Sequence, residues 1–238
     1  MAAAKHGTID GVSGPLQWRG FCDVSDAASR LNRVVIAALL KAGVPAVGLQ
    51  PAASAVCRGG TMFSLATGPI KAALKAGIVP VVHGDVAFDE KLGGTIASTE
   101  DIFAFLAREI RPRWLLLAGE TDGVFGADGT IVSKITPATL TSVEGSLGGS
   151  KGTDVTGGMA SKVRGMLSLV ENLPGARIRI FSGLKPGAVK EALLLAARGD
   201  EDNIQLEDAG NEGIGTVIAA SDAAPLVAVD HLGCSRPS

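Results

Sequence analysis

The segment "ALKAGIVPVV" (Ala73–Val82) decides the fold class, because it repeats the order of an earlier segment, "LLKAGVPAV" (Leu39–Val47). Each has the end of a helical pattern, then Lys-Ala-Gly, then a short apolar run. Glycine commonly ends a helix, and a short apolar run rich in valine is typical of a buried strand. Two such units predict an alternating α/β chain with a mainly parallel sheet.

The same alternation continues along the rest of the chain. We expect helices over Ser25–Ala42, with Ser25 as N-cap, and over Gly68–Gly77, Thr99–Ile110, with Thr99 as cap, Met159–Leu173 and Gly187–Ala197. We expect strands within Val44–Pro51, Ile78–Asp85, Gly93–Ser98, Arg113–Gly119, Arg177–Gly183 and Gly215–Ala220. No linker composition divides the chain, so we expect one domain with two lobes that meet near Pro112.

Composition excludes several classes of protein. The 238 residues are 46% hydrophobic with 32 glycines, which suits a compact enzyme and argues against disorder. A net charge of −2 without a basic block argues against nucleic-acid binding. Three scattered cysteines favour a reducing cytoplasm over a disulfide framework or a zinc site. There is no apolar run of membrane-spanning length and no signal-peptide core.

The segment "TDVTGGMASK" (Thr153–Lys162) predicts a phosphate site. Gly157 and Gly158 come where a loop becomes a helix, so free backbone N–H groups and the helix dipole favour an anion there. Lys162 follows one turn later, about 6 Å along the helix axis, and can bring an ammonium to the same anion. A plain turn followed by a solvated lysine is the alternative interpretation.

Three further glycine-rich loops follow predicted strands: "HGD" (His83–Asp85), "AGETDGV" (Ala118–Val124) and "FSGLKPG" (Phe181–Gly187). Ligands bind at the carboxyl ends of parallel strands, so these loops and the phosphate loop could converge on one cleft. Ordinary α/β domains also carry such loops, and this interpretation stays open.

In combination, these motifs and their order resemble the isopentenyl phosphate kinases of the amino acid kinase superfamily. The resemblance covers "VPVVHGDVAFD", "TIASTEDIFAFLA", "LLLAGETDGVF", "TDVTGGMASKV" and "FSGLKPGAVKEAL". It implies a three-layer αβα sandwich around a mostly parallel sheet, and transfer of the γ-phosphate of ATP, with Mg²⁺, to isopentenyl phosphate. It also implies one kinase domain over residues 1–218, with an acceptor lobe (1–112), a nucleotide lobe (113–218) and a tail (219–238). Relatives often form homodimers, and we expect one here.

The resemblance also implies residue roles. Gly157, Gly158 and Lys162 would contact the ATP phosphates, with Lys162 stabilising charge on the transferred group. Glu120 and Asp122 would lie along the nucleotide. Gly84, through its backbone, and His83 would contact the acceptor. Glu100 or Asp101 would orient catalytic lysines, and Asp101 is our candidate; an ordinary acid at a helix N-terminus is the alternative. No residue is assigned to a protein-bound metal.

The sequence departs from the family pattern at several points. Gly119 and Glu120 replace a Thr-Asp pair, "STEDI" replaces Ser-Gly-Asp-Asp-Ile, and Ala66 replaces an aspartate. The family begins with Lys-Leu-Gly-Gly-Ser at a strand end and a loop of the form His-Gly-x-Gly-Ser-Phe-Gly-His. "AAAKHGTIDGV" (Ala2–Val12) matches the stretch just after that loop. We therefore expect two N-terminal strands to be missing, and either a longer natural protein or a chain that is weakly active or inactive.

Two other functions remain open at this stage. One is another small-molecule kinase of the superfamily, acting on a phosphonate such as fosfomycin or on a carboxylate or carbamate. The other is a non-catalytic nucleotide-binding fragment. The apolar stretches Pro45–Cys57 and Thr61–Ala66 could line a pocket for a prenyl tail, or could be ordinary core.

Overall fold

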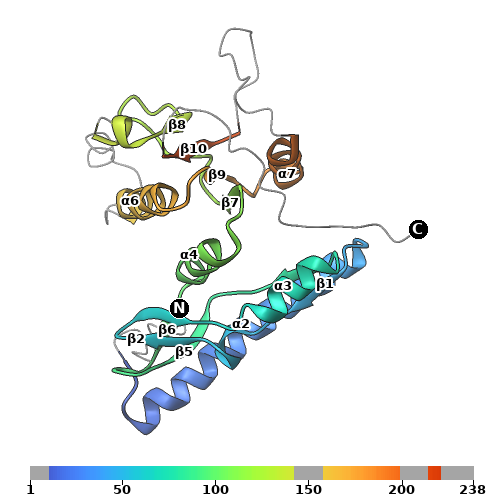
Figure 1. Ribbon diagram of the computed structural model, residues 1–238, viewed down its shortest axis with the longest axis vertical. Coiled ribbons are helices and arrows are strands. Elements are labelled where there is room, and N and C mark those ends of the chain that lie inside the picture. The colour runs from blue at the N-terminus through green and yellow to red at the C-terminus, as the bar shows by residue number, and fades with distance from the viewer. Residues whose placement is uncertain (1–10, 142–157, 199–213, 221–238) are drawn as a thin grey trace. The chain divides into compact units, whose positions relative to one another are not determined.

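The computed structural model describes residues 11–141, 158–198 and 214–220 (Figure 1). Contacts divide the chain into two compact units, Met1–Ile110 and Arg111–Ser238. Within the described ranges, every helix is too short or too polar to cross a lipid bilayer. Most of the predicted tail, from residue 221 onward, lies outside the described residues.

The first unit contains helices and short strands, which alternate as predicted only in part. Its elements are α2 (Pro15–Lys41), β1 (Ala46–Gly48), η1 (Pro51–Ala53), β2 (Val56–Arg58), β3 (Thr61–Ser64), α3 (Gly68–Lys75), β4 (Val79–Val81), β5 (Asp85–Asp89), β6 (Gly93–Ala97) and α4 (Thr99–Ile110). Strands β1 and β4 form a parallel pair, and the other four are ordered β3-β2-β5-β6. In that second sheet β2 and β5 are parallel, and the other two pairs are antiparallel.

Helix α2 begins ten residues earlier than predicted. Pro15 occupies its first turn, and the Gln17 side chain accepts hydrogen bonds from the backbone N–H groups of Ser13 and Gly14 at 3.0 and 3.1 Å. Proline suits this position because its fixed φ is helical and it has no N–H to satisfy. The prediction of Ser25 as N-cap was therefore wrong. Ser25 lies inside the helix, where its Oγ accepts a hydrogen bond from Gln50 Nε2 at 3.1 Å.

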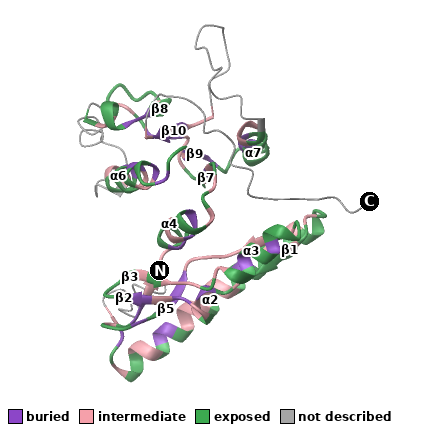
Figure 2. Cartoon of the chain, in the orientation of Figure 1, coloured by how far each residue is buried: buried purple, intermediate pink, exposed green. Residues whose placement is uncertain are grey.

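Strand β1 is shorter and more exposed than the buried strand predicted within Val44–Pro51. Val47 of β1 is 39% exposed, and its neighbour Val79 on β4 is 42% exposed. This sheet has only two described strands, so part of its apolar surface faces away from the described core (Figure 2).

One core cluster of the first unit lies between the β3-β2-β5-β6 sheet and helices α3 and α4, and a second contains Val12, Phe21 and Val86. The first is the larger. Its buried residues are Ala55, Cys57, Ile70, Ala87, Ala97, Ile102 and Leu106. Ala55 and Cys57 come from one of the two apolar stretches that could have lined a prenyl pocket, and Met62 and Leu65 from the other pack against the same cluster. For these residues the core interpretation is correct.

A buried carboxylate, Asp89, joins two turns of this unit. Asp89 is 5% exposed, and it accepts backbone hydrogen bonds from Gly59 and Gly60 after β2 and from Lys91 and Leu92 before β6. Burial alone would raise the pKa of this carboxyl. The four N–H donors outweigh burial and lower its pKa from 3.8 to about 2.

The lowered pKa of Asp89 predicts a pH-dependent stability. A carboxylate whose pKa is lower in the folded state stabilises the fold above its unfolded pKa, and this contribution is lost as the pH falls from about 4 to about 2. The contribution is about 2 kcal/mol. In urea unfolding from pH 6 to pH 2, we expect the gap in unfolding free energy between wild type and Asp89→Asn to shrink by about this amount. A gap that stays constant with pH would contradict this account.

The second unit contains β7 (Trp114–Gly119), β8 (Lys134–Ile135), α6 (Gly158–Glu171), β9 (Arg177–Ser182), α7 (Ala188–Arg198) and β10 (Thr216–Ala219). The sheet order is β7-β9-β10-β8, with β7 parallel to β9, β9 antiparallel to β10, and β10 parallel to β8. The mixed α/β class with parallel strand pairs is thus confirmed in both units. The predicted apolar face of α6 is buried at Val163 and Val170, and Leu173, just after the helix, is buried as well.

An arginine completes the interior of this sheet. Arg179 is 2% exposed; its Nη1 donates to the carbonyl of Ile214 at 2.7 Å, and its guanidinium lies 5.6 Å from the ring centre of Trp114. Arg177, on the same strand, lies 5.8 Å from the same ring. The charged side chain of Arg179 can be buried on β9 because it donates a hydrogen bond to a carbonyl and its guanidinium lies over an aromatic ring.

Candidate functional site

The loop after β4 is held against the start of α4. The backbone N–H of Gly84 donates to Thr99 Oγ1 at 3.1 Å. A Cβ at position 84 would lie 2.9 Å from that oxygen and 3.0 Å from the backbone nitrogen of Thr99, so only glycine fits without movement of the backbone. The structure therefore brings the predicted acceptor residues His83 and Gly84 next to the segment that contains Asp101.

Asp101 takes part in a reciprocal cap at the start of α4. Its Oδ2 accepts hydrogen bonds from the backbone N–H of Ser98 at 3.2 Å and from Ser98 Oγ at 2.7 Å, while the N–H of Asp101 donates to Ser98 Oγ at 3.1 Å. This is a capping box, so the N-cap is Ser98 and not Thr99 as predicted. The predicted catalytic role of Asp101 stays a prediction.

Replacing Asp101 separates the two roles. Asp101→Ala removes the cap acceptor, and we expect it to lower the free energy of unfolding by about 1 kcal/mol. Asp101→Asn keeps an oxygen for Ser98 and removes only the charge, so its melting temperature should stay close to that of wild type. If Asp101→Asn lowers kcat tenfold or more at unchanged melting temperature, the catalytic prediction is supported; an unchanged kcat contradicts it.

His83 is half-buried and lies next to a second carboxylate. Both of its ring nitrogens are buried, and neither has a hydrogen-bond partner among the described residues. His83 Nε2 lies 3.7 Å from Oδ2 of Asp85, whose side chain is fully buried. The two oxygens of Asp85 accept the backbone N–H groups of Val86 at 2.8 Å and Ala52 at 3.4 Å. Buried imidazole nitrogens without partners are uncommon, so His83 has unused hydrogen-bonding capacity.

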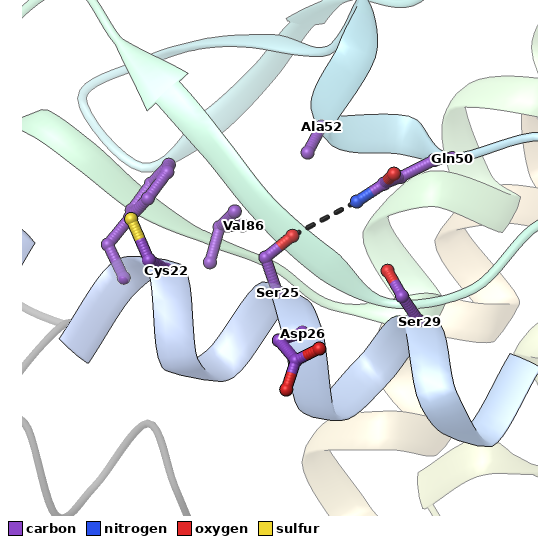
Figure 3. Close-up of a pocket in the computed structure, with 8 residues that line it drawn as sticks. Cys22, Ser25, Asp26, Ser29, Gln50, Ala52 and Val86 are labelled. Atoms are coloured by element: carbon purple, nitrogen blue, oxygen red, sulfur yellow. Dashed lines mark hydrogen bonds between the residues drawn. The ribbon is translucent and has the colours of Figure 1, made fainter. Parts of the chain in front are cut away.

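Val86 and Ala52 also line a hollow of about 350 Å³ between α2 and the start of β5 (Figure 3). Its apolar side is formed by Phe21, Ala52 and Val86, and its polar side by Ser25, Asp26, Ser29 and Gln50 on and opposite α2. Asp85 connects the hollow to His83, because it binds the backbone of two lining residues and lies next to the imidazole. The hollow is shallow and largely open to solvent.

In the second unit, two of the predicted loops leave the same edge of the sheet. Strands β7 and β9 are parallel and their last residues, Gly119 and Ser182, are paired. The backbone N–H of Gly183 donates to the carbonyl of Gly119 at 2.8 Å, and Ser182 Oγ lies 3.5 Å from the carbonyl of Glu120. The loops 120–124 and 183–187 therefore start side by side at the carboxyl ends of parallel strands, where α/β proteins bind ligands.

The 120–124 loop is fixed on both sides of Asp122. Thr121 Oγ1 donates to the carbonyl of Gly123 at 2.8 Å, and the N–H of Val124 donates to Thr216 Oγ1 at 2.8 Å. A Cβ at Gly123 would lie 2.9 Å from that same threonine oxygen. The predicted nucleotide residues Glu120 and Asp122 thus lie on a rigid loop. Asp122 forms an ion pair at 2.9 Å with Lys185 of the neighbouring loop.

Helix α6 begins at Gly158, as the phosphate-loop prediction requires; Gly157 lies outside the described residues. A short turn joins α6 to β9, and the helix packs on β9 and β10. Lys162 is exposed on the second turn of the helix. That Gly158 and Lys162 act together with Glu120 and Asp122 stays a prediction.

Sequence reasoning missed two polar residues at these sites. Thr99, expected only as a helix cap, binds the Gly84 amide, and Lys185 was quoted within "FSGLKPG" without a role. The lysine could have been found from the sequence, because it follows the carboxyl end of a predicted parallel strand. Within the described ranges, no group of three or more His, Cys, Asp or Glu side chains is placed to hold a metal ion.

Comparison with known proteins points to one family. The profile of the amino acid kinase family matches residues 2–182. The chain is 36% identical to an isopentenyl phosphate kinase of Haloferax volcanii, over 79% of this chain and 76% of the relative. It is 33% identical to that of Methanocaldococcus jannaschii, over 77% of this chain and 67% of the relative. An isopentenyl phosphate kinase crystal structure superposes with a TM-score of 0.69 at 26% identity, covering 92% of this chain and 78% of the other.

Proposed function

The chain belongs to the amino acid kinase family, and from this premise we propose that it transfers the γ-phosphate of ATP to isopentenyl phosphate, giving isopentenyl diphosphate. The observation that carries the proposal is the similarity to isopentenyl phosphate kinases along most of the chain, through both units. The strand-end loops of the two units supply groups that suit such a reaction.

The second unit is proposed to bind ATP. Phosphoryl transfer depends on positioning and on neutralising the charge of the transferred group. The N-terminus of α6 offers backbone N–H groups and the positive end of the helix dipole to the phosphates. Lys162 would add its ammonium to the γ-phosphate, while Glu120 and Asp122 would face the nucleotide. Gly157 belongs to the same proposed phosphate contact.

Mg²⁺ is proposed to enter with ATP. Magnesium is usually held by substrate phosphates, one or two carboxylates and water, and seldom by a cage of protein ligands. Glu120 is a carboxylate at this sheet edge, so it fits that pattern as a direct or water-mediated ligand. The ion would draw charge from the phosphate oxygens, and the protein's own contribution would be to orient the triphosphate.

The first unit is proposed to bind isopentenyl phosphate. The hollow beside Phe21 and Val86 could take the five-carbon group, and His83 could donate to the phosphate. The N–H of Gly84 is already bonded to Thr99 Oγ1, so it would reach the phosphate only if that bond opened. The Thr99 hydroxyl accepts that bond and keeps its own proton, which makes it a second donor for the same phosphate.

The remaining proposals concern organisation. Residues 1–112 would form the acceptor lobe and residues 113–218 the nucleotide lobe of one kinase domain. A homodimer is proposed and can be measured by light scattering. A cytoplasmic location is proposed because three scattered cysteines suit a reducing compartment.

A substrate panel tests the function. The protein is incubated with Mg-ATP and, separately, isopentenyl phosphate, fosfomycin and a small carboxylate, and the products are identified by mass spectrometry. We expect isopentenyl diphosphate as the main product, and none without ATP. Phosphorylation of another acceptor at higher kcat/KM would reassign the substrate. ATP binding without transfer to any acceptor would favour a nucleotide-binding protein and contradict the kinase proposal.

A further inference from the structure

We propose that Lys185 is a positioning residue of the nucleotide site, which neutralises Asp122 so that this carboxylate can lie beside the negatively charged triphosphate. The inference rests on the proposed binding of ATP by the second unit. It assigns a role to the lysine of "FSGLKPG", which neither the sequence motifs nor the proposed phosphate contacts used.

The ion pair connects the two loops at the carboxyl ends of β7 and β9. Lys185 Nζ lies 2.9 Å from Asp122 Oδ1. The hydrogen bond from the Gly183 N–H to the Gly119 carbonyl already holds the two loops together, so the side chains of Lys185 and Asp122 start close to each other. The carbonyl of Lys185 accepts the N–H of Ala188, the first residue of α7, which fixes the backbone from which the lysine projects.

Fold stability does not explain this pair. The side chains of Lys185 and Asp122 are 69% and 41% exposed, and ion pairs with such exposure contribute little to folding. The 120–124 loop is also held without the lysine, by the bonds within Thr121–Gly123 and from Val124 to Thr216. The pair is therefore dispensable for the backbone of the loop.

The negative charge of Asp122 explains why a cation is needed beside it. ATP carries several negative charges, and a carboxylate at the same sheet edge repels them unless a cation compensates it. Lys185 is the cation that the structure places on this carboxylate. With the pair intact, Asp122 can still accept hydrogen bonds from the nucleotide through its other oxygen, at little electrostatic cost.

Four variants test the inference by the dissociation constant for ATP and by KM and kcat. Lys185→Ala is expected to weaken ATP binding roughly three- to tenfold, to raise KM for ATP equally, and to leave kcat within twofold. Lys185→Arg should restore binding. The double variant Lys185→Ala with Asp122→Asn should bind ATP more tightly than Lys185→Ala alone, because asparagine removes the uncompensated charge and keeps an acceptor oxygen. Lys190→Ala, an exposed lysine on α7, is the matched control and should bind as wild type.

The outcomes distinguish a failure of this inference from a failure of the proposed function. Wild-type affinity in Lys185→Ala overturns the inference while the proposed function stands. Weakened binding that the double variant does not recover also overturns it, because Lys185 would then contact ATP itself. A wild-type protein that binds no ATP at all would overturn the proposed function, and this inference with it. Circular dichroism of each variant confirms that the fold is retained.

Discussion

Replacing Lys162 by alanine is expected to lower kcat by roughly 10²- to 10³-fold. The lysine is the one proposed to stabilise charge on the transferred phosphoryl group, and a preorganised contact of this kind acts mainly in the transition state. We expect the free energy of unfolding to stay close to that of wild type. Lys162 is exposed on α6, the buried face of the helix is formed by Val163, Leu167 and Val170, and alanine is the best helix former.

The measurement is steady-state kinetics with Mg-ATP and isopentenyl phosphate, beside two matched variants. Lys162→Arg keeps the charge with a different geometry, so it should fall between alanine and wild type. Ser161→Ala changes the exposed neighbour on the same helix and should leave kcat unchanged. If Lys162→Ala keeps kcat within threefold of wild type, the lysine is only a solvated helix residue and the proposed site is wrong.

Gly215→Ala is expected to lower the free energy of unfolding by roughly 3 kcal/mol or more. Gly215 has a φ of +72°, which side chains rarely adopt, and it directly precedes β10. A Cβ there would overlap the carbonyl oxygen of Ile180 and lie 2.9 Å from Phe181 Cβ. Both are fixed in the centre of the β7-β9-β10-β8 sheet, so β10 would have to move away from β9.

Gly129→Ala separates backbone strain from this overlap. Gly129 has a φ of +77°, but nothing lies within 4 Å of its Cβ position. It should therefore cost only the left-handed backbone penalty, about 1 kcal/mol. Denaturant unfolding followed by circular dichroism gives both values. Equal losses for the two variants would mean that the overlap at Gly215 is relieved at no cost.

Regular elements could be predicted where local pattern and end signals agree. Helices α3 and α4 and strands β7 and β9 lie close to their predicted ranges, because glycine stops and apolar runs mark them locally. The start of α2 was missed although Pro15 is a valid first-turn signal, since the polar residues near Ser25 imitate a cap. Strand β5 was missed as a strand of its own because Asp85 and Asp89 bound it. Some of the backbone N–H groups that bind these buried acids come from distant residues, Ala52 for Asp85 and Gly59 and Gly60 for Asp89, and no local pattern shows those partners.

The candidate site shows the same limit. The glycine loops, Lys162 and Asp122 could be selected by residue type and position after strands. The partners of two of these groups could not, because they come from other segments: Thr99 on Gly84 and Lys185 on Asp122. The cap between Ser98 and Asp101 is local, and its Ser-x-x-Asp spacing can be found in the sequence. Whether a carboxylate is compensated or a backbone N–H is already bonded depends on tertiary contacts.

The aromatic residues of the two units have a spectroscopic consequence. The chain has no tyrosine and two tryptophans, one in each unit. Trp18 packs edge-on against Phe21, with ring centres 5.3 Å apart, and Trp114 lies beside the guanidinium groups of Arg177 and Arg179. Intrinsic fluorescence excited at the red edge therefore comes from a single indole per unit, one in an aromatic environment and one beside cations. In a Trp18→Phe or Trp114→Phe variant, the fluorescence of the remaining tryptophan reports on the other unit alone, without any attached dye.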